Sequence, residues 1–217
     1  MESQKIIQIL IYFHALFGAI ALVSGFISLL SQKGKKTHKK LGKLFYYTML
    51  LSAISALIIS VLPQHQSPFL FSIGIFSSYF VLTGYRALRF KKSDVNLKND
   101  KIISGIMMIT GLIMILYNPI VHQTINIVLT AFGLVGLIFS SRDLILFKNK
   151  TRLKSVWLKL HLGKMLGGYI SATTAFVVVN EFFPSFYGWF IPGTIGAFFI
   201  VYWMRRVDKK QTAVRIE

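Results

Sequence analysis

Lysine and arginine residues alternate with apolar sequence along this chain of 217 residues, and this alternation limits the fold more than any other feature. All 25 Lys and Arg residues except Lys5 and Lys164 fall into four clusters. The clusters span residues 33–43, 86–101, 142–159 and 205–215. They occupy every second gap between seven long apolar runs, and the gaps between them contain no Lys or Arg. Because cationic loops are retained on the cytoplasmic side, this pattern predicts a chain that crosses a bilayer seven times.

The predicted fold is therefore an all-α integral membrane protein, a seven-transmembrane-helix bundle with its N-terminus outside and its C-terminus in the cytoplasm. A helix needs roughly 20 residues to cross about 30 Å of hydrocarbon. We expect a single membrane domain over residues 1–217, in which residues 205–217 form a basic cytoplasmic tail. The expected spans cover about residues 6–30, 41–62, 68–86, 101–118, 121–141, 157–180 and 186–204. The fourth apolar run, Ile102 to Tyr117, is short, so its helix must borrow flanking residues.

Composition supports the membrane interpretation and excludes several kinds of chemistry. A chain that is 54% hydrophobic has too little polar surface for a soluble domain, so the lipid bilayer is its expected partner. The net charge of +18 would attract anionic lipid head groups at the cytoplasmic face, by roughly 1 kcal/mol per basic residue, and we expect no nucleic-acid binding. The absence of cysteine excludes disulfides, thiolate nucleophiles and Cys-ligated metals. Motifs of P-loop, zinc-protease and serine-hydrolase sites are also absent.

Three histidines are the main candidates for a binding site, because ionisable residues inside a bilayer are usually retained for a partner or a function. His14 shares one face of the first span with small residues. It is either hydrogen-bonded in a tightly packed helix seam, or it is a ligand or proton-handling group. His38 either belongs to the lysine-rich segment at the cytoplasmic end of the second span or is a ligand. His161 lies near the same end of the sixth span, which is rich in small and polar residues.

Depth in the membrane limits which histidines could hold a haem, since two axial imidazoles must lie at matched depth. His14 lies roughly 18 Å from His161 along the membrane normal, so these two cannot share an iron. His38 and His161 are both expected at the cytoplasmic end and could share one. A single b-type haem is therefore the most concrete cofactor. His65 and His122 could meet only in a superficial metal site at the outer rim, and we name no metal-ligating residue.

Two cationic residues could instead serve an anionic ligand. Lys164 lies about one turn inside the cytoplasmic edge of the sixth span. It either extends its ammonium group to the interface or acts as a counter-ion for an anionic substrate or a cofactor carboxylate. Arg86, at the end of the third span, could act with it toward an anionic solute or a partner lipid.

Three segments carry a resemblance to a known family. They are His14–Gly18 together with His38–Gly42, then Thr83–Ala87, then His161–Tyr169 continuing to Asn180. In these segments the chain resembles uncharacterised bacterial multi-pass membrane proteins of the domain-of-unknown-function 2306 type. The resemblance implies a protein of the bacterial inner membrane with the three histidines as its principal functional positions, and it implies no particular reaction. The family more often has His-Arg before its second glycine, whereas His38-Lys39 here lacks the planar donor fork of arginine.

Two functions remain open at this stage. The first is a seven-span plasma-membrane protein that binds a small ligand or a single haem between its first, second and sixth spans. The alternative is a non-catalytic small-solute transporter, or an assembly or partner subunit of a membrane complex. In the alternative, the small-residue faces serve only helix contacts.

Overall fold

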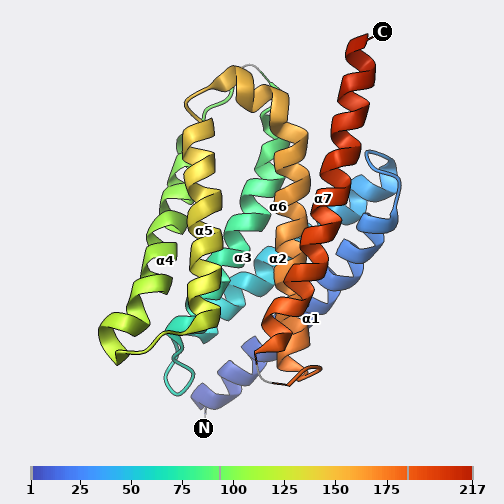
Figure 1. The fold of residues 1–217 in the computed structure, drawn as a ribbon. Helices are drawn as coiled ribbons and strands as arrows, with labels where there is room; N and C mark the ends of the chain where they lie inside the picture. Colours follow the sequence, from blue (N-terminus) through green and yellow to red (C-terminus); the bar gives the residue numbers. More distant parts are fainter. Residues whose placement is uncertain (1, 93, 185, 217) are drawn as a thin grey trace.

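The computed structural model describes residues 2–92, 94–184 and 186–216, and throughout this part of the chain the regular structure is helical (Figure 1). The elements are α1 (Glu2–Leu30), α2 (Lys36–Ile59), α3 (Pro68–Arg86), the short 3-10 helix η1 (Ala87–Arg89), α4 (Lys98–His122), α5 (Ile127–Leu146), α6 (Lys150–Val179) and α7 (Tyr187–Ile216). The seven α-helices are long and apolar enough to cross a membrane. The predicted all-α, seven-helix fold is confirmed.

Polar side chains set the start of three helices. Ser67, Asn126 and Asn149 each accept a hydrogen bond from the backbone N–H three residues later, in the first turns of α3, α5 and α6. Such caps satisfy donors that have no partner inside the helix. Pro68 follows the first of these caps, at a position where its missing N–H costs nothing.

The connection between α4 and α5 lies later in the chain than the expected spans imply. The short fourth run borrows residues at both ends, so that α4 is 25 residues long. Gln123 then adopts a left-handed conformation, with φ of 51°, that ends the helix. α5 begins after its cap Asn126, at residue 127 rather than 121, and it continues beyond residue 141. As a result Asp143 lies inside a helix instead of in a loop.

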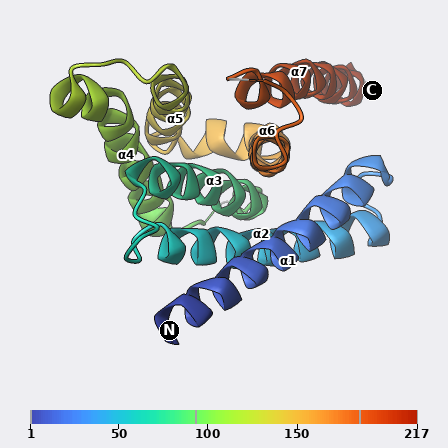
Figure 2. The same cartoon turned by 90° about the horizontal axis from the view of Figure 1, so that it is seen from below.

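α3 and α6 form the centre of the bundle (Figure 2). α3 packs against α2, α4 and α6, whereas α1 packs mainly on α2, α5 mainly on α4, and α7 on α6. One core of buried side chains, which includes Tyr79 and Met107, joins α3, α4 and α5. A second core, which includes Ala21, Phe45 and Val81, joins α1, α2, α3 and α6. The two central helices therefore connect an α1–α2 pair, an α4–α5 pair and the outer helix α7.

Large apolar side chains cover the outer surface of the bundle. Ile9 on α1 is 65% exposed and Phe198 on α7 is 75% exposed, and many other aliphatic and aromatic residues are exposed in the same way. A surface of this kind would aggregate in water, but it suits contact with lipid tails. Together with the seven long apolar helices, it identifies a multi-pass membrane protein embedded in a lipid bilayer.

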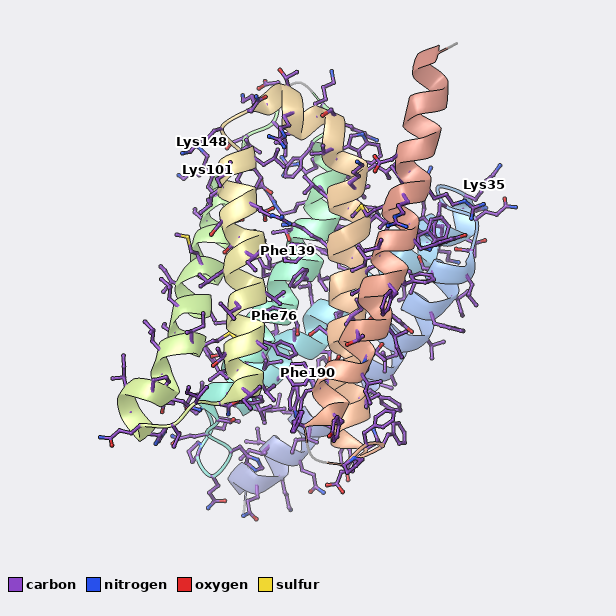
Figure 3. The ribbon with its side chains drawn as sticks, viewed as in Figure 1. Lys35, Phe76, Lys101, Phe139, Lys148 and Phe190 are labelled. Carbon is purple, nitrogen blue, oxygen red and sulfur yellow. The ribbon has the colours of Figure 1, made fainter. Side chains whose placement is uncertain are left out.

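The charged residues define one end of the bundle, which we call the basic end. It carries the α1–α2, η1–α4 and α5–α6 connections and the last turns of α7, and the four Lys and Arg clusters lie in these segments and in the helix turns next to them. Figure 3 shows Lys35, Lys101 and Lys148 toward this end, whereas Phe76 and Phe139 lie deeper, among the helices. The connections at the opposite end contain no Lys or Arg.

α4 and α5 approach each other closely at a pair of glycines. A Cβ atom added to Gly111 would lie 2.9 Å from the carbonyl oxygen of Gly133, and one added to Gly133 would lie 2.8 Å from the carbonyl oxygen of Gly111. Both distances are too short for any side chain. The two helix backbones are therefore in direct contact, as in other small-residue seams of membrane proteins.

Candidate functional site

His14 and His38 join α1 and α2 through two equivalent sets of hydrogen bonds. His14 Nδ1 donates to the carbonyl oxygen of Ser52 (2.9 Å), and Ser52 Oγ donates to the carbonyl oxygen of His14 (3.1 Å). In the same way, His38 Nδ1 donates to the carbonyl oxygen of Ser28 (3.0 Å), and Ser28 Oγ donates to the carbonyl oxygen of His38 (3.3 Å). In each helix the serine follows the histidine by 14 positions. Because α1 and α2 are antiparallel, the histidine of each helix therefore lies opposite the serine of the other.

The glycine of each His-xxx-Gly segment belongs to the same arrangement. A Cβ atom added to Gly18 would lie 3.3 Å from Ser52 Oγ, and one added to Gly42 would lie 3.4 Å from Ser28 Oγ. Each glycine thus leaves room for the serine that bonds the neighbouring histidine. α1 and α2 form a pseudo-symmetric pair, and the face of α1 that carries His14 is buried at Ala21 and Ser28.

His161 on α6 is held in a comparable way by α3. Its Nδ1 donates to the carbonyl oxygen of Gly84 at 2.8 Å. Since a carbonyl oxygen can only accept, Nδ1 carries the proton in the neutral form of all three imidazoles, and the lone pair lies on Nε2. Histidines that bind a metal through one ring nitrogen usually donate the other N–H to a carbonyl or a carboxylate, which fixes the ring orientation.

Two of these three histidines line one cavity, which we call the basic-end cavity. It has a volume of about 960 Å³ and is walled by α1, α2, α6, α7 and the end of α3 with η1. His38 and His161 line it, and His14 lies outside it. Aromatic side chains, including Phe45, Tyr169 and Trp203, form part of the wall. The volume is at the upper end of the range of about 300–1,000 Å³ that is usual for small-molecule sites.

The charge around the basic-end cavity has one sign. Its described lining residues include six cations and no Asp or Glu. The cations are Lys33, Lys35, Lys39, Lys43, Lys91 and Arg206. A cavity with low-dielectric walls concentrates such a field, so the arrangement favours an anionic occupant.

The α1–α2 connection meets α7 at the wall of this cavity. Lys33 Nζ lies 4.8 Å from the ring centroid of Trp203, and the guanidinium carbon of Arg206 lies 5.4 Å from it. The Lys33 ammonium also donates to the carbonyl oxygen of Leu29 in the last turn of α1, and partial burial lowers the pKa of Lys33 below its ordinary value. The indole nitrogen of Trp203 is the only buried side-chain nitrogen or oxygen in the described part of the chain that lacks a hydrogen-bond partner.

A second polar site, the Asp143 cluster, lies where α3, α4, α5 and α6 meet. Asp143 Oδ2 accepts hydrogen bonds from Tyr79 OH (2.6 Å), from Ser104 Oγ (3.2 Å) and from Lys164 Nζ. Lys164 Nζ also donates to Tyr79 OH (3.1 Å) and lies 4.6 Å from the centroid of the Tyr79 ring. None of the four side chains is more than 4% exposed. Opposite charges and matched donors allow this buried group to exist inside the bundle.

The two cations expected to face an anionic ligand therefore have partners within the chain. Lys164 is paired with Asp143, and Arg86 forms a two-point ion pair with Asp100, in which Nε lies 2.7 Å from Oδ1 and Nη2 lies 2.8 Å from Oδ2. Neither cation lines the basic-end cavity. The cavity is supplied with positive charge by other residues, chiefly from α2 and the α1–α2 connection.

Sequence reasoning missed both acidic partners. Asp100 and Asp143 are two of only seven acidic residues in the chain, and each lies beside a basic residue at the end of an apolar run. An isolated acid in that position was the available signal for a buried partner, but the expected spans left both residues in loops. His65 and His122 are exposed, and no group of three or more His, Cys, Asp or Glu side chains that could hold a metal is present in residues 2–92, 94–184 and 186–216.

Comparison with known proteins supports the membrane assignment. Residues 11–104 match the family described as "Predicted membrane protein (DUF2306)". The match covers α1 from residue 11, then α2, α3, η1 and the start of α4, and it confirms the resemblance drawn from the His14 to Gly42 and Thr83 to Ala87 segments. No curated protein and no solved structure matches the chain.

Proposed function

We propose that this protein binds one small, anionic, amphipathic ligand in the basic-end cavity, and that a single b-type haem is the most concrete candidate. The observation that carries the proposal is that His38 and His161, on different helices, line one cavity with Nδ1 of each already bonded to a carbonyl. This leaves Nε2 of both rings available to a ligand. An imidazole that binds a metal through Nε2 likewise carries its proton on Nδ1.

The residues around the cavity fit a haem in three respects. His38 and His161 would supply two imidazole ligands to the iron, and the carbonyl oxygens of Ser28 and Gly84 hold their rings in place. Apolar and aromatic side chains such as Phe45 would cover the macrocycle, and the lining cations would pair with its carboxylates. A bound haem would supply one-electron transfer, with a potential that depends on its axial ligands and on burial.

The proposal places the basic end in the cytoplasm and the bundle in the plasma membrane, which in a bacterium is the inner membrane. Its support is the segregation of the Lys and Arg clusters to one end of the bundle, since such loops are retained on the cytoplasmic side. In this orientation the cavity faces the cytoplasm, and anionic lipid head groups would surround its mouth.

The test is an optical spectrum of the detergent-solubilised protein, purified from haem-replete cells and also titrated with hemin. We expect one haem per chain, with the Soret band and sharp reduced α-band of a six-coordinate bis-histidine complex. His38→Ala and His161→Ala should each abolish this spectrum. His14→Ala is the matched control and should leave it intact, because His14 lies outside the cavity. A colourless protein that hemin does not convert to the bis-histidine form would remove the haem assignment.

A second function, small-solute transport or service as a partner subunit of a membrane complex, is favoured by a different observation. Exposed residues such as Lys35 and Lys39 line the cavity, so the cavity reaches the protein surface and a solute could enter it from the basic end. A colourless protein whose unfolding temperature rises with an added anionic solute would favour transport. Stoichiometric co-purification of other membrane proteins would favour a subunit role.

A further inference from the structure

The indole N–H of Trp203 is a donor without an acceptor in a region of excess positive charge. It is buried in the wall of the basic-end cavity, with Lys33 and Arg206 near its ring. A buried donor of this kind is rare in folded proteins and costs free energy until an acceptor reaches it. The described residues of the cavity wall provide no carboxylate that could serve.

We propose that Lys33, Trp203 and Arg206 form a subsite for the acidic group, a carboxylate or a phosphate, of an amphipathic ligand whose apolar part occupies the basic-end cavity. The inference rests on the proposed ligand-binding function, and it adds the chemical class of the ligand and the place where its acidic group is held. An anionic oxygen would accept from the indole N–H and from the two cations. Hydrogen bonds between charged groups are the stronger kind.

The contacts of Lys33 distinguish the subsite from the other basic residues that line the cavity. Lys35 and Lys39 also line the cavity, but they are exposed and mark its mouth. Lys33 is exposed as well, but it differs from them in its contacts, because its ammonium bonds carbonyls in the last turn of α1 and lies over the indole ring. The nearby acid on α7, Asp208, is paired with Lys159 and is not part of the cavity wall.

The rest of the wall supports an amphipathic ligand rather than a free inorganic anion. Leu162, Met165, Leu166 and Val207 also line the cavity, together with the imidazoles of His38 on α2 and His161 on α6. A small ion would leave this apolar surface unused. An acidic group joined to an apolar body would fill both parts.

The indole nitrogen is enclosed, so an acceptor reaches it only when a neighbouring side chain moves. Lys33 is the neighbour best able to move. It belongs to the short connection between α1 and α2, and its unbranched side chain bonds backbone carbonyls and lies over the Trp203 ring. An incoming anion would exchange these carbonyls for a charged partner of Lys33.

The test compares pairs of probes that differ in the acidic group, added to the full chain in a neutral detergent. One pair is oleate and oleyl alcohol, and the other is phosphatidylglycerol and phosphatidylcholine; inorganic phosphate is a further probe. Dissociation constants are measured by titration, with the shift in unfolding temperature as a second readout. We expect each acidic probe to bind about tenfold tighter than its neutral counterpart, and inorganic phosphate to bind weakly.

Two variants isolate the subsite. Trp203→Phe keeps an aromatic ring for the cations but removes the N–H donor, and Lys33→Gln removes one charge. Each should reduce the preference for the acidic probe several-fold while leaving binding of the neutral probe nearly unchanged. Trp189→Phe, at the opposite end of α7, and Lys148→Gln, in the α5–α6 connection, are the matched controls and should keep the preference.

The outcomes separate this inference from the haem assignment. A preference seen with phosphatidylglycerol alone identifies a lipid phosphate as the bound group, and one seen with oleate alone identifies a carboxylate; both support the subsite. His38→Ala and His161→Ala should lose the haem spectrum and retain the acidic preference. If Trp203→Phe and Lys33→Gln both keep the full preference, or if Lys148→Gln lowers it equally, the subsite does not exist, whatever the haem spectrum shows.

Discussion

At the scale of single residues, the Asp143 cluster places two opposite charges in the buried interior of the bundle. Asp143 and Lys164 are almost fully removed from solvent, and each would be strongly unfavourable alone. They coexist because the carboxylate accepts three hydrogen bonds and the ammonium has both Asp143 and Tyr79 as acceptors. The cluster also joins four helices, so its integrity should be visible in the stability of the whole bundle.

Replacement of Asp143 by Ala should be severely destabilising, because it leaves the Lys164 ammonium buried without a counter-ion. We expect a loss of about 3–5 kcal/mol in the free energy of unfolding, measured by denaturant titration in detergent. The double variant Asp143→Ala/Lys164→Ala should recover part of this loss. Lys159→Ala, which breaks the exposed pair with Asp208, is the control and should cost at most about 1 kcal/mol. Equal effects of the buried and exposed variants would contradict this account.

Tyr79→Phe tests the hydroxyl separately from the charges. The variant keeps the ring in the core of α3, α4 and α5 but removes a donor to Asp143 and an acceptor of Lys164. A hydrogen bond to a charged group contributes about 1.5–3 kcal/mol, so a loss in that range is expected. Tyr12→Phe, on the exposed face of α1, should be nearly neutral in the same assay. If the two tyrosine variants unfold alike, the Tyr79 hydroxyl has no role in the cluster.

The sequence was sufficient to predict which histidines lie at the same end of the bundle, because this depends only on position along a helix. It was not sufficient to predict the acidic partner of a buried cation, because that partner lies on another helix. Position along the spans predicted that His38 and His161 lie at the same end and that His14 and His161 could not share an iron. His38 and His161 line one cavity, and His14, also a candidate ligand, lies outside it. The partners of Arg86 and Lys164 depend on how α4 and α5 pack, which no local pattern specifies. Asp143 was also hidden because α5 extends further than its apolar run.

At the scale of helices, contact between backbones determines which helices pair. The small residues that share one face of α1 with His14 recur at helical spacing, and that face is buried at Ala21 and Ser28. They did not predict that α1 and α2 would bond each other reciprocally through His14 with Ser52 and His38 with Ser28. That arrangement requires the antiparallel register of two helices, which becomes visible only in three dimensions.

The contact of α4 with α5 provides a test at this scale. Gly133→Ala would place a Cβ atom 2.8 Å from the carbonyl oxygen of Gly111, so the helices must separate. We expect a loss of about 1–3 kcal/mol, the usual cost of overpacking, read from the unfolding midpoint. Gly105→Ala, on the same pair of helices but with open space around its Cβ position, should be neutral or slightly stabilising. A stabilising Gly133→Ala would show that α4 and α5 are further apart than described.

At the scale of the whole molecule, the charge distribution and the cavity belong to the same end of the bundle. The central helices α3 and α6 hold the α1–α2 pair on one side and α7 on another, and the cavity lies among them at the basic end. Six of the cations that give the protein its predicted orientation therefore also line the cavity. Access to the cavity from the cytoplasm and contact with anionic lipid both require that this end faces the cytoplasm.

The most direct test is the membrane sidedness of two single-cysteine variants, made in a chain that has no cysteine of its own. Gln64→Cys lies in the exposed α2–α3 connection, and Asp94→Cys lies in the exposed connection before α4, at the basic end. With a membrane-impermeant maleimide on intact cells, the account predicts that Gln64→Cys is labelled at once, whereas Asp94→Cys is labelled only after the membrane is permeabilised. Labelling of both residues from the same side, or the reverse pattern, would contradict it.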